Sequence, residues 1–369
     1  MRNTSRPGRS SRVRALVCTV VHHTTDARIF RREIGALLDA GIDVTAIAPW
    51  PAGTESTTAY RKVTVPRAVG RQRLAALRAA RARIRELAHD HEVLIVHDPE
   101  LLVVLPWSDL RRARVRVVWD VHEDLAAALA MKSYLPGFAR AALVPIVRML
   151  ERWVESRAML LLAESAYQGR FRRAHPVVLN LPLVPDEQPM TVRKRQAIYV
   201  GSITRARGLD AMLEIAPLLQ QSGVALRIIG EAPNPEDAAR LAACPGVEWH
   251  GALPNAEAMR EVEESMVGLA LLTDQPNYRH SMPTKILEYM ASGAAVIATP
   301  LPLSQQVIGD DGVLLPGFDL PAAAIAAAVT HLCDDEERRQ RYATAGYQRV
   351  RSRFNWNVAK HDFVSAVRG

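Results

Sequence analysis

Patterns typical of buried strands alternate with helical patterns along both halves of the 369-residue chain. Short runs rich in β-branched residues, such as VLIV and VRVVW, are separated by segments whose apolar residues recur at helical spacing. This alternation is typical of parallel sheets with helices packed on their faces, in which the carboxyl ends of the strands form the ligand edge. We therefore expect an α/β protein with two Rossmann-like, doubly wound domains that face a cleft.

A stretch rich in Pro and charge divides the pattern near the middle of the chain. Residues 184–196 are expected to link an N-terminal domain, 13–183, to a C-terminal domain, 197–353. Residues 1–12 are expected to be a disordered basic tail. The apolar run that follows lacks a small-x-small cleavage site, so we expect a first core strand there and no signal peptide. The last segment, 354–369, is expected to be helical.

Composition limits the class of protein and of partner. Hydrophobic residues make up 49% of the chain and charged residues 23%, as in soluble globular proteins, and no apolar run is long enough to span a membrane. The net charge of +8 predicts an anionic partner. Because no zinc-finger spacing or Lys/Arg run accompanies it, we expect a nucleotide diphosphate or an anionic membrane surface, and no nucleic acid. Three widely spaced cysteines exclude a disulfide framework and suggest a reducing compartment.

The stretch His280–Pro300, HSMPTKILEYMASGAAVIATP, predicts a short helix followed by a buried strand. Pro283 suits the first helical position because it has no N–H to leave unpaired, and Gly293 can supply a left-handed cap. The N-terminus of such a helix favours an anion, so a phosphate could bind there beside Lys285. Glu288 could then accept two hydroxyls of the sugar that carries the phosphate. The alternative is an ordinary amphipathic helix with both charges in solvent.

Polar residues follow three of the strands expected in the N-terminal half. They are His22, His23, Asp26 and Arg28, then His97, Asp98 and Glu100, and finally Asp120, His122, Glu123 and Asp124. Because parallel strands bring their carboxyl ends to one edge, these residues are expected at a ligand crevice. They could also ligate a divalent metal, but no further His or Cys pair completes a site, so we expect none. Adjacent histidines could equally cap and solvate a turn.

Two helical patterns in the N-terminal half carry arginines beside apolar residues. Between Gly70 and His89, one face carries the apolar residues and the neighbouring face carries the arginines, namely Leu77, Ala80, Ile84 and Leu87 against Arg71, Arg78, Arg81 and Arg85. The segment Pro136–Val154 is apolar on more than one side, and Pro145 interrupts it. Ordinary solvated or packed helices would explain both patterns. The more specific hypothesis is that these helices contact an anionic lipid surface.

Together these motifs resemble the retaining glycosyltransferases of family 4, which have the GT-B fold. The resemblance covers nearly the whole chain from about Val13, and its carriers are HHTTDARIFRRE, VHDPELL, VWDVHEDL, IYVGSITRARGL, RIIGEAPN, VEWHGALPN, PTKILEYMASGAAVIATP and the FNW of the tail. It implies an N-terminal acceptor domain and a C-terminal domain that binds a nucleotide-diphosphate sugar. It also implies that the last helix, near Trp356, crosses back onto the N-terminal domain.

The resemblance implies how the donor is held. Glu288 matches the second of two signature glutamates and would bind ribose hydroxyls, whereas His280 stands at the first position. The segment VEWHG corresponds to the part that lines the base, and Glu231 follows a glycine turn near the nucleotide. The donor-binding candidates are Gly201, Arg205, Glu231, His250, His280, Ser281, Pro283, Thr284 and Glu288.

The resemblance also implies catalytic roles. Arg207 matches the second member of a basic pair that balances the diphosphate, but Ser202 stands at the first, so Arg205 and Lys285 are the local substitutes. His122 matches a histidine beside the anomeric carbon. The catalytic candidates are His122, Arg207, Lys285 and Asp26, and the acceptor-side candidates are His22, His23, Arg28, His97 and Glu123. No metal is expected, and the leaving phosphate oxygen can itself take the acceptor proton.

We therefore expect a cytoplasmic enzyme, peripheral at the inner face of the cell membrane, that transfers a sugar from a UDP- or GDP-sugar to a saccharide or lipid-linked acceptor in cell-surface polysaccharide or glycolipid assembly. No cofactor is expected. The departures at His280 and Ser202 leave a non-catalytic relative that binds a nucleotide or a partner protein as the alternative. A metal-dependent hydrolase built on WDVHED and an NAD-dependent oxidoreductase are further alternatives, and the second is disfavoured because GxGxxG occurs nowhere in the chain.

Overall fold

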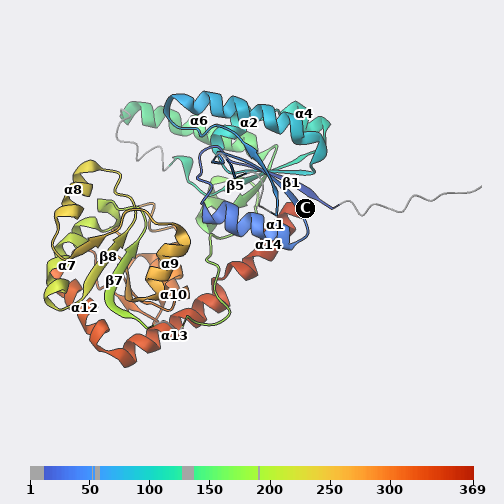
Figure 1. The fold of residues 1–369 in the computed structure, drawn as a ribbon. Coiled ribbons are helices and arrows are strands. Elements are labelled where there is room, and N and C mark those ends of the chain that lie inside the picture. The colour runs from blue at the N-terminus through green and yellow to red at the C-terminus, as the bar shows by residue number, and fades with distance from the viewer. Residues whose placement is uncertain (1–11, 52, 55–58, 127–136, 190–191) are drawn as a thin grey trace, which may run out of the picture. The chain divides into compact units, whose positions relative to one another are not determined.

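The chain folds into two compact units, each built around a six-stranded parallel sheet (Figure 1). The computed structural model describes residues 12–51, 53–54, 59–126, 137–189 and 192–369. The first unit comprises the described residues up to Val178 together with Lys360–Gly369, and the second is Leu179–Ala359. The prediction of an α/β protein with two doubly wound parallel sheets is confirmed.

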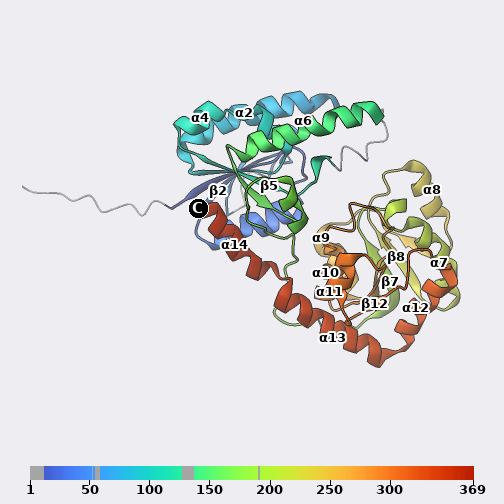
Figure 2. The ribbon, with the colours of Figure 1, turned by 180° about the vertical axis from the view of Figure 1, so that it is seen from behind.

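The sheet of the first unit has the order β3-β2-β1-β4-β5-β6, so its topological switch point lies between β1 and β4. Its strands are β1 (Arg14–Cys18), β2 (Asp43–Ala48), β3 (Arg61–Thr64), β4 (Val93–Val96), β5 (Arg116–Val121) and β6 (Met159–Leu162). Its helices are η1 (Ala27–Glu33), α1 (Ile34–Asp39), η2 (Gly70–Gln72), α2 (Arg73–Leu87), η3 (Ala88–Asp90), α3 (Pro99–Val104), α4 (Trp107–Arg112), α6 (Gly137–Glu155) and η4 (Ser165–Arg170). Helices α2, α4 and α6 cover one face of the sheet, and α1 lies on the other (Figure 1 and Figure 2).

The sheet of the second unit repeats this plan in the order β12-β11-β10-β7-β8-β9, with its switch point between β7 and β10. Its strands are β7 (Lys194–Val200), β8 (Ala225–Ile229), β9 (Val247–Trp249), β10 (Ser265–Ala270), β11 (Ala295–Ala298) and β12 (Val313–Leu314). Its helices are η5 (Arg205–Arg207), α7 (Leu209–Gln221), α8 (Pro235–Ala243), α9 (Asn255–Glu263), α10 (Thr284–Ala291), α11 (Pro302–Ile308), α12 (Ala322–Asp334) and α13 (Glu336–Arg353). Helices α7, α8 and α12 lie on one face of the sheet and α9 and α10 on the other (Figure 1).

The last helix, α14 (Trp356–Arg368), begins in the second unit, and its residues from Lys360 onward belong to the first. There Lys360 Nζ lies 2.9 Å from Asp39 Oδ2, and Arg368 Nη2 donates to the Ala40 carbonyl over 2.6 Å. Phe363 is fully buried. The predicted return of the C-terminal helix to the N-terminal half is therefore present.

Several local predictions differ from the structure. After β6 the described part of the chain adds only one further bridge to the first sheet, between Leu162 and Val177, and Pro176 beside it cannot donate to a ladder. Strand β7 begins at Lys194, inside the segment 184–196 expected as a linker. Pro283 is the N-cap of α10 and not its first helical residue. Helix α6 continues through Pro145, whose exposed position lets solvent satisfy the carbonyl that loses its partner.

The two arginine-bearing helices have the faces that the sequence predicts where the structure describes them. In α2, Leu77, Ala80, Ile84 and Leu87 are buried, while Arg71 before it and Arg78, Arg81 and Arg85 within it are exposed. In α6, Leu143, Ile146 and Met149 are 36%, 53% and 66% exposed, so one side of this helix carries an apolar stripe in solvent. Within the described ranges, no helix is long and apolar enough to cross a membrane.

Candidate functional site

A cavity of about 480 Å³ opens in the second unit beside the carboxyl ends of β7 and β10. This is the edge at which a doubly wound sheet binds ligands. The predicted site residues that line it are Gly201, Arg207, Ser281, Pro283, Thr284, Lys285 and Glu288. The N-terminus of the eight-residue helix α10 contributes three of these, Pro283, Thr284 and Lys285, and Glu288 lies one turn further along the same helix.

Two glycines let the loops after β7 and β8 approach each other closely. A Cβ at Gly230 would lie 1.9 Å from the carbonyl oxygen of Gly201. A Cβ at Gly201 would lie 2.6 Å from Lys285 Nζ. Both residues have positive φ, 145° and 137°, a region that L side chains rarely adopt. The loop after β7 thus leaves space for the amine of Lys285, and glycine is required for this.

The amine of Lys285 is held by a carbonyl and an aromatic ring. Nζ donates to the Val200 carbonyl over 2.7 Å and lies 4.0 Å from the centre of the Tyr199 ring. Burial and the charge of the neighbouring Arg207 together lower the pKa of Lys285 to about 7, although Glu288 opposes the shift. The cavity therefore contains two cationic groups that repel each other, which is an arrangement suited to an anion.

Four of the donor-binding candidates lie elsewhere. Among the described residues, the cavity lining does not include Arg205, Glu231, His250 or His280. Arg205 instead pairs with α8, where its Nε lies 3.1 Å from Asp237 Oδ1. The other three side chains are exposed. His280 was predicted from its place at the first signature position, Arg205 as a substitute for Ser202, and His250 and Glu231 from segments expected near the nucleotide, so their donor-binding roles stay predictions.

Sequence reasoning missed other residues of the lining, among them Asn255, Asn277, Tyr278 and Ser304. Asn277 and Tyr278 belong to the loop between β10 and α10, which begins at the switch point of the sheet. That position is the signal that could have identified them.

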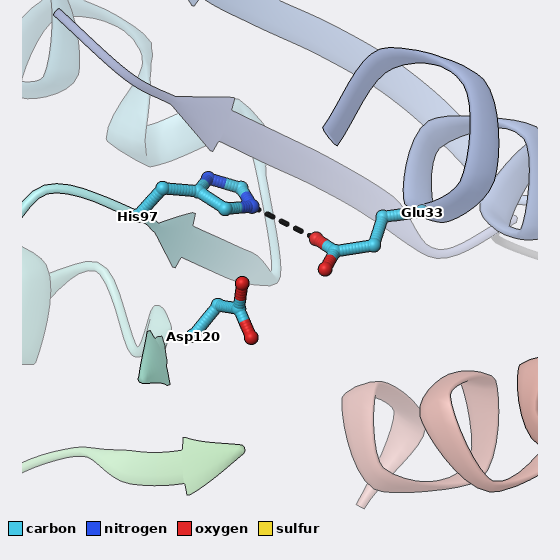
Figure 3. Close-up of side chains that lie close together, drawn as sticks. All are labelled: Glu33, His97 and Asp120. Atoms are coloured by element: carbon cyan, nitrogen blue, oxygen red, sulfur yellow. Dashed lines mark hydrogen bonds and ion pairs between the residues drawn. The ribbon is translucent and has the colours of Figure 1, made fainter. Parts of the chain in front are cut away.

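A buried network of charges joins β4, β5 and η1 in the first unit. His97 Nε2 lies 2.8 Å from Glu33 Oε2, and Asp120 lies beside this pair (Figure 3). Arg28 donates to both carboxylate oxygens of Asp120, over 2.9 and 2.6 Å, and its Nε is 3.0 Å from Glu33 Oε1. All four side chains are at most 7% exposed. Glu33 was not predicted from the sequence. Its position four residues after Ile29 and four before Leu37 nevertheless puts it on the buried helix face.

The network sets the charges of its members. Burial alone would lower the pKa of His97, but the charge and the hydrogen bond of Glu33 raise it to about 9. Burial would raise the pKa of Asp120, but Arg28 and His122 hold it well below its usual value. One ligand atom from each of Glu33, His97 and Asp120 could meet within 4.8 Å, as a metal site requires. The guanidinium of Arg28 and the imidazolium of His97 together balance the charges of the Glu33 and Asp120 carboxylates.

The histidines after β1 and β5 face each other at the edge of this network. His22 Nε2 and His122 Nε2 are 3.0 Å apart, and the rings meet edge to face. Asp26 caps η1 by accepting from the Ile29 N–H over 3.0 Å, and its Oδ2 is 3.2 Å from His22 Nδ1. The structure thus brings together the candidates His22, Asp26, Arg28, His97 and His122.

Two acceptor-side candidates point away from this group. His23 is exposed, and its Nε2 lies 2.6 Å from Arg67 Nη1. Glu123 is also exposed, and it takes part through its main-chain carbonyl, which accepts from Arg170 over 3.1 Å. Of the two adjacent histidines, the first alone faces the network.

Comparison with known proteins gives matches at the level of domain, sequence and fold. Residues 194–335 match the family model described as glycosyl transferases group 1. The chain is 24% identical over 314 residues to a phosphatidyl-myo-inositol mannosyltransferase of Mycobacterium leprae (strain TN), covering 82% of this chain and 80% of that protein. Among solved structures, it resembles sucrose-phosphate synthase from Thermosynechococcus elongatus, with a TM-score of 0.70, 16% identity and coverage of 97% and 98%. It also resembles Anabaena HepE in complex with UDP and glucose, with a TM-score of 0.68, 11% identity and coverage of 96% and 98%.

The buried charge of His97 predicts a pH-dependent stability. Because its folded pKa of about 9 lies above the ordinary value of 6.5, it stabilises the fold fully below about pH 6.5, and this contribution is lost as the pH rises through 9. The contribution is on the order of 3 kcal/mol. Urea unfolding of the wild type and of His97→Gln should therefore show a stability difference at pH 6 that shrinks at pH 9.5. A difference that is the same at both pH values would contradict the assignment of the charge to His97.

Proposed function

Because the chain is a glycosyltransferase with the GT-B fold, whose residues 194–335 form a glycosyl transferases group 1 domain, we propose that it is a retaining enzyme of family 4. Its donor would be a UDP- or GDP-sugar, and its acceptor a lipid-linked or other saccharide. The observation that carries this proposal is the cavity at the N-terminus of α10, where Lys285 and Arg207 stand beside a helix end and Glu288 lies one turn away.

A diphosphate suits the cationic end of this cavity. The N-terminal end of a helix favours negative charge, and two basic side chains add to it. In the transfer step the bond between the sugar and the diphosphate breaks, and negative charge grows on the departing phosphate oxygen. Lys285 and Arg207 would stabilise that charge in a partly buried place, where electrostatic interactions are stronger than in water.

Lys285 also offers an explanation for the serine at position 202. The family pattern places a basic residue there, and in this chain an amine reaches the same loop from α10 instead. The space above Gly201 admits it. Arg205, the other candidate substitute, is paired with α8 and is a poor replacement.

Glu288 is suited to bind the ribose. It follows the cationic end of the cavity by one helical turn, about 5 Å. A carboxylate can accept hydrogen bonds from two neighbouring hydroxyls, as the ribose of a nucleotide presents. The relatives support the donor class, since HepE was solved with UDP and glucose.

We place the acceptor at a membrane, as the similarity to a phosphatidyl-myo-inositol mannosyltransferase suggests. The surface of the first unit fits this role, because the apolar stripe of α6 is exposed and Arg148 and Arg152 on the same helix are exposed as well. Helix α2, on the same face of the sheet, adds arginines, although Arg73 and Arg85 are paired with Glu100 and Asp109. An anionic lipid surface would take both the apolar and the basic side chains. The protein would then act at the cytoplasmic face of the membrane in polysaccharide or glycolipid assembly.

The alternative is a relative that binds a nucleotide without transferring a sugar, which the exposed His280 motivates. Release of UDP or GDP from a nucleotide-sugar, with an α-configured product from an α-configured donor, separates the two. Nucleotide binding without turnover across a panel of donors and acceptors would favour the alternative.

Replacing Glu288 tests the ribose assignment. Glu288→Gln should weaken UDP or GDP binding by about 10- to 100-fold, because charge-assisted hydrogen bonds to two hydroxyls are weakened. Calorimetry measures the affinity, and the variant should lose discrimination between the nucleotide and its 2′,3′-dideoxy analogue. Glu257→Gln, an exposed acid in the first turn of α9, is the matched control and should bind as the wild type does. Unchanged affinity in Glu288→Gln would refute the assignment.

The lowered pKa of Lys285 predicts that nucleotide binding takes up a proton. With a pKa of about 7 in the free protein, the amine is largely neutral at pH 8, and a bound diphosphate would restore its charge. Calorimetry in buffers of different ionisation enthalpy should show uptake close to one proton at pH 8 and well below one at pH 6. Lys285→Met should remove this uptake, whereas Lys194→Met, at the exposed start of β7, should keep it. Equal uptake in the wild type and Lys285→Met would show that another group takes the proton.

Vesicle flotation tests the lipid-binding surface. The wild type should float with vesicles containing phosphatidylglycerol and less with phosphatidylcholine alone, because the attraction is partly electrostatic. Ile146→Ser with Met149→Ser should reduce binding severalfold, since both side chains are exposed and would enter the lipid. Val358→Ser, an exposed apolar residue on α14, serves as the control. Flotation that is indifferent to lipid charge and to the α6 changes would exclude this surface.

A further inference from the structure

The two histidines at the edge of the first sheet share an unusual geometry. His22 and His122 come from the loops after β1 and β5, and their Nε2 atoms are 3.0 Å apart. The ring centres are 4.8 Å apart, and the planes meet at 68°. This is hydrogen-bonding distance, so one of the two nitrogens must donate and the other must accept.

The other nitrogen of each ring faces an acceptor. His22 Nδ1 lies 3.2 Å from Asp26 Oδ2, and His122 Nδ1 lies 3.2 Å from the Asp120 carbonyl and 3.4 Å from its Oδ2. Burial would raise the pKa of Asp26, but its hydrogen bonds with His22 and the Ile29 N–H lower it to about 2. Asp120 is held ionised by Arg28 and by His122. Ionised carboxylates and carbonyls only accept, so both Nδ1 atoms carry a proton.

This leaves a single proton for the two Nε2 atoms. If both rings were neutral, two lone pairs would face each other at 3.0 Å. If both rings were cations, two N–H groups would point at each other over the same distance. One proton between the nitrogens satisfies both, and the pair then carries one positive charge.

The charged groups around the pair favour this state. Asp98 Oδ1 lies 3.6 Å from His22 Nε2, and Asp98 is fixed by hydrogen bonds from the Thr19 hydroxyl and the Val20 and Val21 amides. Asp26 and Asp120 add negative charge at the Nδ1 sides. Arg28 opposes a second proton, and so does His97, whose ring centre is 6.3 Å from that of His122. Glu33 is neutralised by the same Arg28 and His97.

We propose that His22 and His122 hold one proton between their Nε2 atoms, and that His22 is a positioning residue that fixes the orientation and the charge of His122. Both nitrogens of His122 are then engaged, so its imidazole cannot accept a proton from an acceptor hydroxyl while the pair is intact. The ring instead presents a fixed positive charge at the carboxyl edge of the first sheet. Its effect on transfer rests on the proposed function above, whereas the shared proton itself does not.

Histidine titration by NMR tests the shared proton directly. In the wild type labelled with 15N-histidine, His122 should titrate in two steps separated by at least about 2 pH units, because the proton held at its Nε2 hinders uptake of another. In His22→Asn, His122 should titrate in one step. His23→Asn, which changes the exposed neighbour, is the matched control and should leave both steps in place. The resonance of His97, still charged up to about pH 9, reports that the first unit remains folded.

A single step for His122 in the wild type, unmoved by His22→Asn, would overturn the shared proton. The positioning role has its own readout in donor turnover. His22→Asn should lower kcat at least tenfold and shift its pH profile while the donor KM stays unchanged, and His22→Gln, which can still donate to His122 Nε2, should restore part of kcat. An unchanged kcat and pH profile in His22→Asn would overturn the positioning role. If the wild type failed to bind UDP and GDP, the proposed function would be rejected, and the NMR result on the shared proton would still stand.

Discussion

The bidentate pair between Arg28 and Asp120 organises the first unit. It joins residues 92 positions apart, and the same guanidinium donates to the Val178 carbonyl, over 3.4 and 3.3 Å. Taking these charges out of water is costly, and the cost is offset because every charged partner has a counter-charge within hydrogen-bonding distance. Removing one partner of such a pair typically costs about 3–5 kcal/mol. The position of η1, and with it the histidine edge, depends on this contact.

In the second unit, the corresponding close contacts depend on glycines, which have no side chain. Glycines at positions 201 and 230 let two loops meet, and the space above Gly201 receives the Lys285 amine. The amine is held by a carbonyl and an aromatic face, neither of which is charged, so burial lowers its pKa. Glu288 on the same helix opposes this shift only in part. Under the proposed function, an anionic ligand would add further negative charge beside the amine.

The units also differ in what they expose. The face of the first unit formed by α2, α4 and α6 carries exposed apolar side chains together with arginines. Two of these arginines, Arg73 and Arg85, are paired with Glu100 and Asp109 on neighbouring helices, which limits the electrostatic attraction that this face can exert. The apolar stripe of α6 stays exposed, since Leu143, Ile146 and Met149 recur at a helical period on the side away from the core.

The sequence by itself determined the fold and the helix α10 whose N-terminal end lines the cavity. Strand and helix periods fix which faces are buried, and a helix start with Lys285 and Glu288 at successive turns gives its own geometry, so local information was sufficient. Tertiary structure alone decided which neighbours in sequence share a site. His22 and His23 are adjacent, yet one faces His122 and the other Arg67; Arg205 and Arg207 flank one residue, yet one pairs with α8 and the other lines the cavity. Glu33 has a partner 64 positions away. Side-chain direction and long-range partners depend on how loops and strands are packed, which periodicity does not encode.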